Sequence, residues 1–126
     1  MEISLSRSFI CTPGNHIQKV ISSSMKTKKI FITSRSLKHI YDRHIFEKRT
    51  PADFYILLSS LKDMANNPDK IYEDKISKRG SYIFVNKINK KLYGCIIENV
   101  NAEESEVVSA FVSGEKYLKK FALLWS

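Results

Sequence analysis

The short segment from His39 to His44 contains the residue types in this chain that are best suited to acid–base chemistry. It reads His-Ile-Tyr-Asp-Arg-His. An imidazole exchanges protons near neutral pH because its pKa lies in that range, and the Arg43 guanidinium offers permanent charge and a bidentate fork to phosphate oxygens. On a helix, His39 and Arg43 lie one turn apart and face the same way. The segment indicates phosphate chemistry; the alternative is a satisfied core histidine at position 44 and a surface histidine at position 39.

A hydroxyl group stands on the alternating segment 106–113. The even-numbered residues from Val108 to Val112 form one face of this expected strand, which we assign to the core. Ser109 and Phe111 lie on the other face. A half-exposed face with a hydroxyl and an aromatic ring can hold a nucleotide, although such a mixed face is also typical of an ordinary outer strand surface.

Several familiar catalytic motifs are absent from the sequence. It contains no GxxxxGK[ST] or GxGxxG loop, no HExxH and no GxSxG, and no set of carboxylates has the spacing of a two-metal nuclease. We therefore expect neither a metal ion nor a cofactor. RNA permits cleavage without a metal because its own 2′-OH can attack the adjacent phosphate, so the protein need supply only a base, an acid and positive charge. DNA lacks that nucleophile.

The composition is that of one small, basic, globular domain. The 126 residues are 43% hydrophobic and include 7 Phe and 6 Tyr, which excludes a wholly disordered chain, and no apolar run approaches the length of a membrane span. With 21 Lys and Arg against 13 Asp and Glu, the net charge is +8, which favours a polyanionic partner. Residues 26–49 hold eight bases and two acids, so the excess charge surrounds the His39–His44 segment.

Cysteine usage and the N-terminus suggest a reducing compartment. Cys11 and Cys95 lie far apart and cannot build a four-ligand zinc site. The segment from Met1 to Gly14 lacks the basic start and apolar block of a secretory signal. We expect two plain thiols and a cytoplasmic location, with a single disulfide as the alternative.

Two helices are expected to position the histidines. After a β-prone stretch at 29–33, Ser34 fits an N-cap for a helix over residues 35–45. The apolar stripe of this helix is Leu37, Ile40, Tyr41, His44 and Ile45. Thr50 and Pro51 have the pattern of an N-cap followed by proline at N1, which starts a second helix that continues to about Asn66.

The second half of the chain reads as strands. After Pro68 the apolar period changes from about 3.6 to 2, and the strands are expected at 70–76, 81–88, 92–100 and 106–113. Asn89-Lys90 is a candidate two-residue turn, and apolar residues from Tyr117 to Trp125 fit a closing helix. These elements predict an α+β fold, with N-terminal helices packed on a four-stranded antiparallel sheet (a meander) and a C-terminal helix.

The order of these segments resembles the phage-associated barnase–EndoU–colicin–RelE-like nucleases. The resemblance covers residues 30–125. Its motifs are H-I-x-x-R-H (His39 to His44), N-P-D, R-G-S-Y, G-C-I-I-E, V-V-S-A-F and Y-L-K-K. It implies a helix and a four-stranded antiparallel sheet, and metal-independent cleavage of RNA. Residues 29–126 are then a single nuclease-like domain, and residues 1–28 an N-terminal arm or linker.

The resemblance also implies which side chains act. Matching positions make His39, Arg43, His44 and Ser109 catalytic; serine stands where the pattern often has threonine, which keeps the hydroxyl. The candidate substrate-binding residues are basic or aromatic: Arg35, Lys75, Arg79, Tyr82, Lys87 and Lys116. A catalytic lysine stays open among Lys75, Lys87 and Lys116, and Tyr82 can stack a base.

The resulting hypothesis is a metal-independent ribonuclease that leaves a 2′,3′-cyclic phosphate and acts as a phage or toxin-type effector. Its location would be the cytoplasm of a bacterial host or target cell. Expected partners are RNA, with tRNA as one candidate, and a cognate immunity or antitoxin protein; no membrane is expected. Two alternatives remain: a non-catalytic nucleic-acid-binding module on the same fold, or a protein-interaction or phage structural component.

Overall fold

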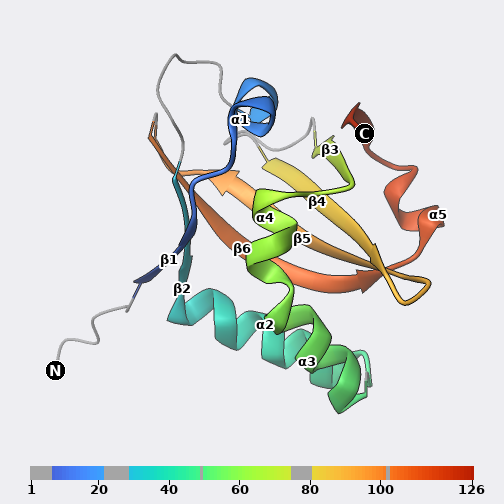
Figure 1. Cartoon of the computed structure of the whole chain (residues 1–126). Coiled ribbons are helices and arrows are strands. Elements are labelled where there is room, and N and C mark those ends of the chain that lie inside the picture. Colours follow the sequence, from blue (N-terminus) through green and yellow to red (C-terminus); the bar gives the residue numbers. More distant parts are fainter. Residues whose placement is uncertain (1–6, 22–28, 49, 75–80, 102) are drawn as a thin grey trace, which may run out of the picture.

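The fold is built around one mixed β-sheet (Figure 1). The computed structural model describes residues 7–21, 29–48, 50–74, 81–101 and 103–126. Its seven strands are β1 (Arg7–Cys11), β2 (Lys29–Thr33), β3 (Lys70–Asp74), β4 (Ser81–Ile88), β5 (Lys91–Asn99), β6 (Glu104–Ser113) and β7 (Ala122–Trp125). They lie in the order β1-β2-β6-β5-β4-β3-β7. β2 and β6 run parallel, and every other neighbouring pair is antiparallel.

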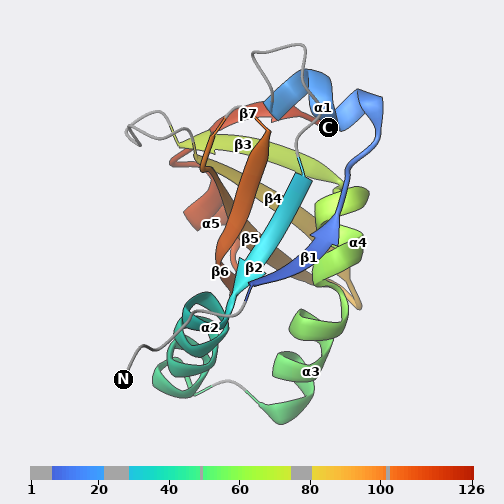
Figure 2. The same ribbon diagram turned by 90° about the vertical axis from the view of Figure 1, so that its left-hand side faces the viewer.

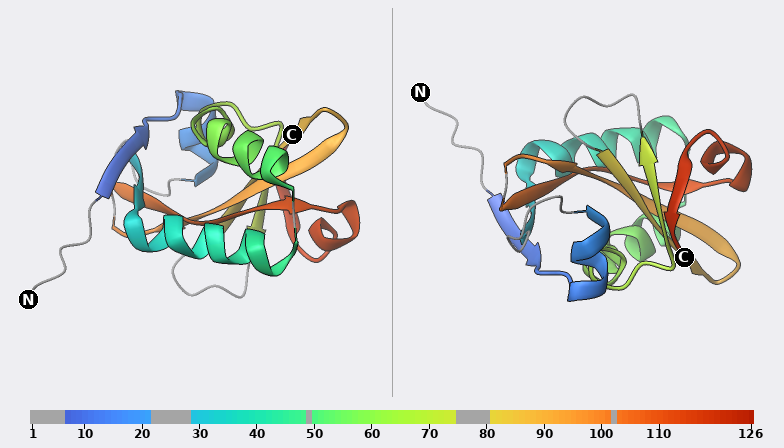
Figure 3. Two further views of the ribbon diagram at one scale, coloured as in Figure 1. Left: turned by 90° about the horizontal axis from the view of Figure 1, so that it is seen from below. Right: turned by 90° about the horizontal axis from the view of Figure 1, so that it is seen from above.

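Helices cover both faces of this sheet. They are α1 (Asn15–Ile21), α2 (Ser34–Phe46), α3 (Pro51–Ser59), α4 (Leu61–Asn66) and α5 (Glu115–Leu118). Figure 3 shows α1, α3 and α4 on one side of the sheet and α5 on the other. The core is divided accordingly: a larger cluster includes Ile17 and Met64, and a smaller one joins Phe111 to Leu118. Among the described residues, no helix has the length and apolar character needed to cross a membrane.

The prediction of a four-stranded antiparallel sheet is wrong, because the sheet extends beyond both sides of the expected meander. β3 to β6 are antiparallel neighbours, but β2 pairs in parallel with β6 and joins β1 to the sheet. Ile30 and Ile32 of β2 are buried, so a place in the sheet removes their apolar surface from water. Residues before position 29 contribute β1 and α1, whose Ile17 is fully buried.

The C-terminal segment also differs from its prediction. α5 ends at Leu118, and Ala122–Trp125 forms β7, which pairs with β3. The edge of β3 carries backbone donors and acceptors that need partners, and β7 supplies them. Leu123 and Leu124 remain 52% and 39% exposed. Backbone pairing therefore overrides an apolar spacing that fits a helix.

α2 begins and packs differently from its sequence prediction. Thr33, and not Ser34, is the N-cap: its Oγ1 accepts a hydrogen bond from the Ser36 amide at 3.1 Å. The buried residues of α2 are Ile40 and His44. The other members of the expected apolar stripe are exposed, namely Leu37, Tyr41 and Ile45. The packed face of α2 is thus rotated toward Arg43.

The local signals after α2 are largely confirmed. Thr50 caps α3, and its Oγ1 accepts from the Asp53 amide at 3.2 Å. The expected second helix is divided at Ser60. The Ser60 Oγ donates to the Ile56 carbonyl at 2.6 Å, which also accepts from the Ser60 amide at 3.0 Å, a side-chain bond that often bends a helix. The two-residue turn between β4 and β5 is present, and Asn89 and Lys90 have φ of 51° and 68°, as a type I′ turn requires.

Both cysteines are free and buried in the larger cluster. Burial raises the pKa of the Cys11 thiol to about 11 and that of the Cys95 thiol to about 12. Because the thiolate is the reactive form, we expect both to react with a thiol reagent at about pH 8 far more slowly in the folded protein than in denaturant. Labelling of the folded protein at the denatured rate would contradict this burial.

Candidate functional site

Arg43 is held between α2 and β6 by three contacts. Its Nε donates to Glu47 Oε1 at 2.7 Å, and its Nη1 donates to Ser109 Oγ at 3.3 Å. The guanidinium carbon lies 4.5 Å from the centroid of the Phe111 ring. Glu47 stands one turn after Arg43 on the same helix face. These contacts use two of the five N–H donors, and the others bind no described residue. The guanidinium is therefore a fixed, half-exposed donor group.

The topology of the sheet explains how α2 reaches β6. β2 pairs only with the first part of β6, as far as Val107. The chain then turns into α2, which packs against β6 beyond that point. Figure 2 shows β2 leading into α2, with α3 beside it. The parallel pairing of β2 with β6 therefore sets the place where Arg43 meets Ser109.

A bulge and a glycine orient Phe111. Ile96 is opposite Ser109, while Ile97 is opposite Val107. Val108 is therefore the extra residue of a β-bulge, which changes the side of the sheet toward which the following side chains point. Val107, and not Val108, is fully buried in the core. Phe111 lies opposite Gly94, where an added Cβ would stand 3.1 Å from the ring. Gly94 thus leaves room for the ring under Arg43.

His44 lies at the inner side of the same site. The residue is 9% exposed, and its ring centroid is 4.6 Å from that of Phe54 on α3. Among the described residues, every fully buried side-chain nitrogen or oxygen has a partner. His44 hydrogen-bonds to no described residue, so its nitrogens reach solvent.

A small hollow joins His44 to Arg43. Its lining also includes Glu47, Asp53 and Phe111, and its volume is about 10 Å³, the space of a single water molecule. A ribose phosphate does not fit inside. A group of that size could reach the Arg43 guanidinium only from the outer surface, where the guanidinium is half-exposed.

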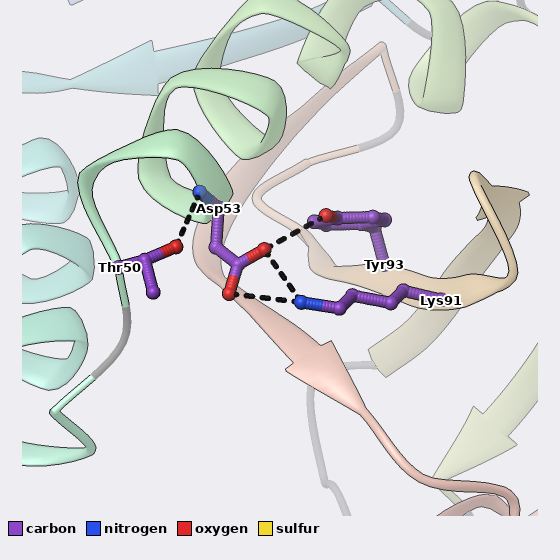
Figure 4. A network of polar contacts seen from close by, with 4 residues as sticks. All are labelled: Thr50, Asp53, Lys91 and Tyr93. Carbon is purple, nitrogen blue, oxygen red and sulfur yellow. Dashed lines mark hydrogen bonds and ion pairs between the residues drawn. The ribbon is translucent and has the colours of Figure 1, made fainter.

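Asp53 also lines this hollow and is the centre of a polar network (Figure 4). Its carboxylate accepts from Lys91 Nζ at 3.0 and 3.3 Å and from the Tyr93 hydroxyl at 3.3 Å. The hydrogen bond from Lys91 lowers the pKa of Asp53, while burial raises the pKa of Tyr93. The network ties the start of α3, capped by Thr50, to β5.

The charge on Asp53 stabilises the folded chain. Because the folded pKa lies below that of an unfolded aspartate, about 3.9, this contribution is fully present above that pH. It is lost as the pH falls through the folded pKa. We expect Asp53→Asn to lower the Tm near neutral pH, by an amount that shrinks as the pH falls below about 4.

Circular dichroism melts over that pH range measure the difference. Asp42→Asn, at an exposed position of α2, is the matched control and should leave the Tm unchanged. An Asp53→Asn effect that is equal at every pH would mean that packing, and not charge, causes it.

The structure brings together some of the sequence-derived site residues and separates others. Arg43, His44 and Ser109 converge. His39 is exposed and makes no hydrogen bond or ring contact with a described residue. Tyr82 packs against the larger cluster, on the sheet face opposite Phe111.

The remaining candidates lie at a distance from this cluster or cannot be placed. Arg35 and Lys116 are exposed on α2 and α5, and Lys87 lines a separate hollow. Lys75 and Arg79 lie outside the described residues.

Sequence reasoning missed two members of the site, Glu47 and Asp53, and placed a third, Phe111, in the wrong surroundings. Glu47 had a detectable signal, since it follows Arg43 by one helical turn. Phe111 was expected beside Ser109 on a half-exposed strand face that can hold a nucleotide; its ring is instead 3% exposed and packs in the smaller cluster under Arg43. Asp53 had no local signal, because its partners Lys91 and Tyr93 are distant in sequence. Within the described part of the chain, no three histidine, cysteine, aspartate or glutamate side chains form a group that could hold a metal ion.

Comparison with known families gives independent information about the chain as a whole. The family model described as phage-Barnase-EndoU-ColicinE5/D-RelE like nuclease3 matches residues 13–120. The chain belongs to this family. The matched region extends from α1 to α5 and includes Arg43, His44 and Ser109. Its description supports a phage-associated nuclease activity in general. No curated protein and no solved structure matches the chain.

Proposed function

We propose that this chain is an endoribonuclease that cleaves RNA without a metal ion and leaves a 2′,3′-cyclic phosphate. The observation that carries the proposal is the fixed Arg43 guanidinium, held by Glu47, Ser109 and Phe111 beside the His44 imidazole. One place thus offers a permanent cation, a hydroxyl and a proton-exchanging group. These are the functions that cleavage by the 2′-OH requires.

The roles follow from the donors that remain available. Arg43 binds the non-bridging oxygens of the reacting phosphate through N–H groups that Glu47 and Ser109 do not use. The Ser109 hydroxyl accepts from Arg43 and keeps its own proton, which it donates to a phosphate oxygen. Both contacts strengthen as negative charge builds on the phosphorane, so they stabilise the transition state more than the substrate.

Proton transfer completes the reaction. His44 takes the proton from the 2′-OH through one water molecule in the hollow. The 2′-oxygen then forms a bond to phosphorus, and the bond from phosphorus to the 5′-oxygen breaks. A second group protonates the leaving 5′-oxygen. His39, one turn before Arg43 on the same helix face, is the candidate for this second role. The products are a 2′,3′-cyclic phosphate and a 5′-hydroxyl.

The test uses purified protein, a panel of RNAs that includes tRNA, and matching DNA strands, all in excess EDTA. We expect RNA fragments with 2′,3′-cyclic phosphate ends and intact DNA. Absence of cleavage across the panel would contradict the proposal. If such a protein still bound RNA, with an affinity that falls steeply with salt because phosphate contacts release counterions, it would be a non-catalytic nucleic-acid-binding module.

The wider biological setting stays a prediction. A toxin or phage-effector role implies a cognate immunity or antitoxin protein, and the net charge of +8 favours an acidic one. The cytoplasmic location is part of the same prediction. Co-expression with candidate acidic proteins, followed by co-purification and loss of RNA cleavage, would identify such an inhibitor.

A further inference from the structure

A second hollow lies on the sheet face that α5 covers. Its volume is about 510 Å³, within the range of small-ligand sites. Its apolar floor includes Val85 and Leu118, which belong to the same small cluster as Phe111. The hollow therefore shares its face of the sheet with the ring that supports Arg43.

The lining of this hollow combines aromatic rings with ammonium groups. Tyr72 and Phe121 are half-buried, so part of each ring is open to the hollow. Lys70, Lys87 and Lys119 also line it and are exposed. Aromatic faces stack nucleobases and lysines bind phosphates, and this pairing is typical of single-stranded nucleic-acid sites.

Two carboxylates line the hollow as well. Asp69 Oδ2 accepts from the Lys87 amide at 2.9 Å, and the Asp69 amide donates to Asn86 Oδ1 at 2.6 Å. This carboxylate is thus part of the wall. Glu115 is exposed at the start of α5. Three lysines against two acids leave the lining net positive, which suits a ligand with one phosphate and one base.

A row of aromatic contacts connects this hollow to Arg43. The Arg43 guanidinium lies over Phe111, whose ring is 5.5 Å from that of Tyr117. Tyr117 is in turn 5.3 Å from Phe121, which lines the hollow. Three contacts therefore connect Arg43 with the hollow along one side of the sheet, a separation that a few nucleotides of a single strand can span.

We propose that this hollow binds one nucleotide of the RNA strand, a short distance from the phosphate that is cleaved. This inference rests on the proposed function, and it adds that the substrate is single-stranded where it crosses the sheet. The base stacks on Tyr72 and Phe121, and its phosphate is bound by the lysines. Lys87, a sequence-derived substrate-binding candidate, acts here and not at the reacting phosphate.

The first experiment measures binding without cleavage. Nucleoside monophosphates are titrated into isotope-labelled protein, and amide chemical shifts are followed by NMR. We expect the changes to gather at Lys70, Tyr72, Lys87 and Phe121. No change there would overturn the inference even if RNA is cleaved, and equal changes with inorganic phosphate alone would also overturn it. Changes there without any cleavage of RNA would support this site while contradicting the proposed nuclease function.

The second experiment separates stacking from general stability. Phe121→Leu keeps an apolar contact with Tyr117 but removes the aromatic face. It should weaken binding of a 2′-O-methyl RNA of about eight nucleotides roughly tenfold. Phe46→Leu is the matched control, at a position on α2 that is 85% exposed. The affinity of this variant for the same RNA should be unchanged. Equal affinity of both variants, with unchanged melting temperatures, would contradict the inference.

Discussion

Replacing Arg43 with alanine should lower kcat/KM for RNA by about 10²–10³, because one preorganised donor to a developing oxyanion contributes on this scale. The guanidinium is fixed by Glu47 and Ser109 before substrate binds. Arg43→Lys should recover only part of the loss, since an ammonium keeps the charge but not the bidentate fork or the stacking on Phe111. Initial rates on a fluorogenic RNA in EDTA measure the difference.

Stability must be separated from chemistry in this comparison, because Arg43 also packs on Phe111. Thermal melts of both Arg43 variants serve that purpose. Lys38→Ala removes one positive charge from an exposed position of the same helix and should keep nearly the full rate. If a folded Arg43→Ala protein cleaves RNA within about threefold of the original rate, far below the expected loss, the assignment of Arg43 to the phosphate is wrong.

Replacing His44 with alanine should lower kcat by about 10²–10⁴, the usual contribution of a positioned acid–base group. A general base must be neutral to accept a proton, so the acid limb of the pH–rate profile should disappear in this variant. His39→Ala should have a smaller effect. His39 is exposed, and water or buffer can replace it as a proton donor.

His16 supplies the control for the histidine variants. It is exposed and lies beside Trp125, with ring centroids 5.9 Å apart, far along the chain from α2. His16→Ala should leave the pH profile unchanged. If the acid limb of the pH–rate profile is lost in His39→Ala but kept in His44→Ala, His39 and not His44 is the general base. That result would contradict the role given to His44.

Helical periodicity located α2 but not its packed face. The apolar stripe includes Leu37, Tyr41 and Ile45, yet these side chains are 41%, 51% and 56% exposed. α2 instead turns Ile40 and Arg43 toward β6. Pattern counting treats arginine as a solvent residue, whereas a guanidinium can pack on an aromatic ring and remain hydrated at its edge. A search for apolar residues at helical spacing therefore does not detect a charged residue on the packed face of a helix.

Contacts between distant segments account for most of what the sequence could not predict. The chemistry-bearing motif at His39–His44 and the strand that holds Ser109 were both found locally. Their meeting depends on the parallel pairing of β2 with β6, and no local pattern in β2 specifies a partner. The same holds for β7, whose place on β3 reflects an available strand edge more than its own apolar spacing.

The most direct test of cleavage by the 2′-OH uses a DNA strand that contains a single ribonucleotide, incubated with the protein in excess EDTA. We predict one cut, at the phosphate that follows the ribonucleotide, with a 2′,3′-cyclic phosphate at the new end. Methylation of that 2′-oxygen should abolish the cut, and Arg43→Ala should slow it by about 10²–10³. Cleavage at DNA phosphates, or of the 2′-O-methylated strand, would contradict the proposed mechanism.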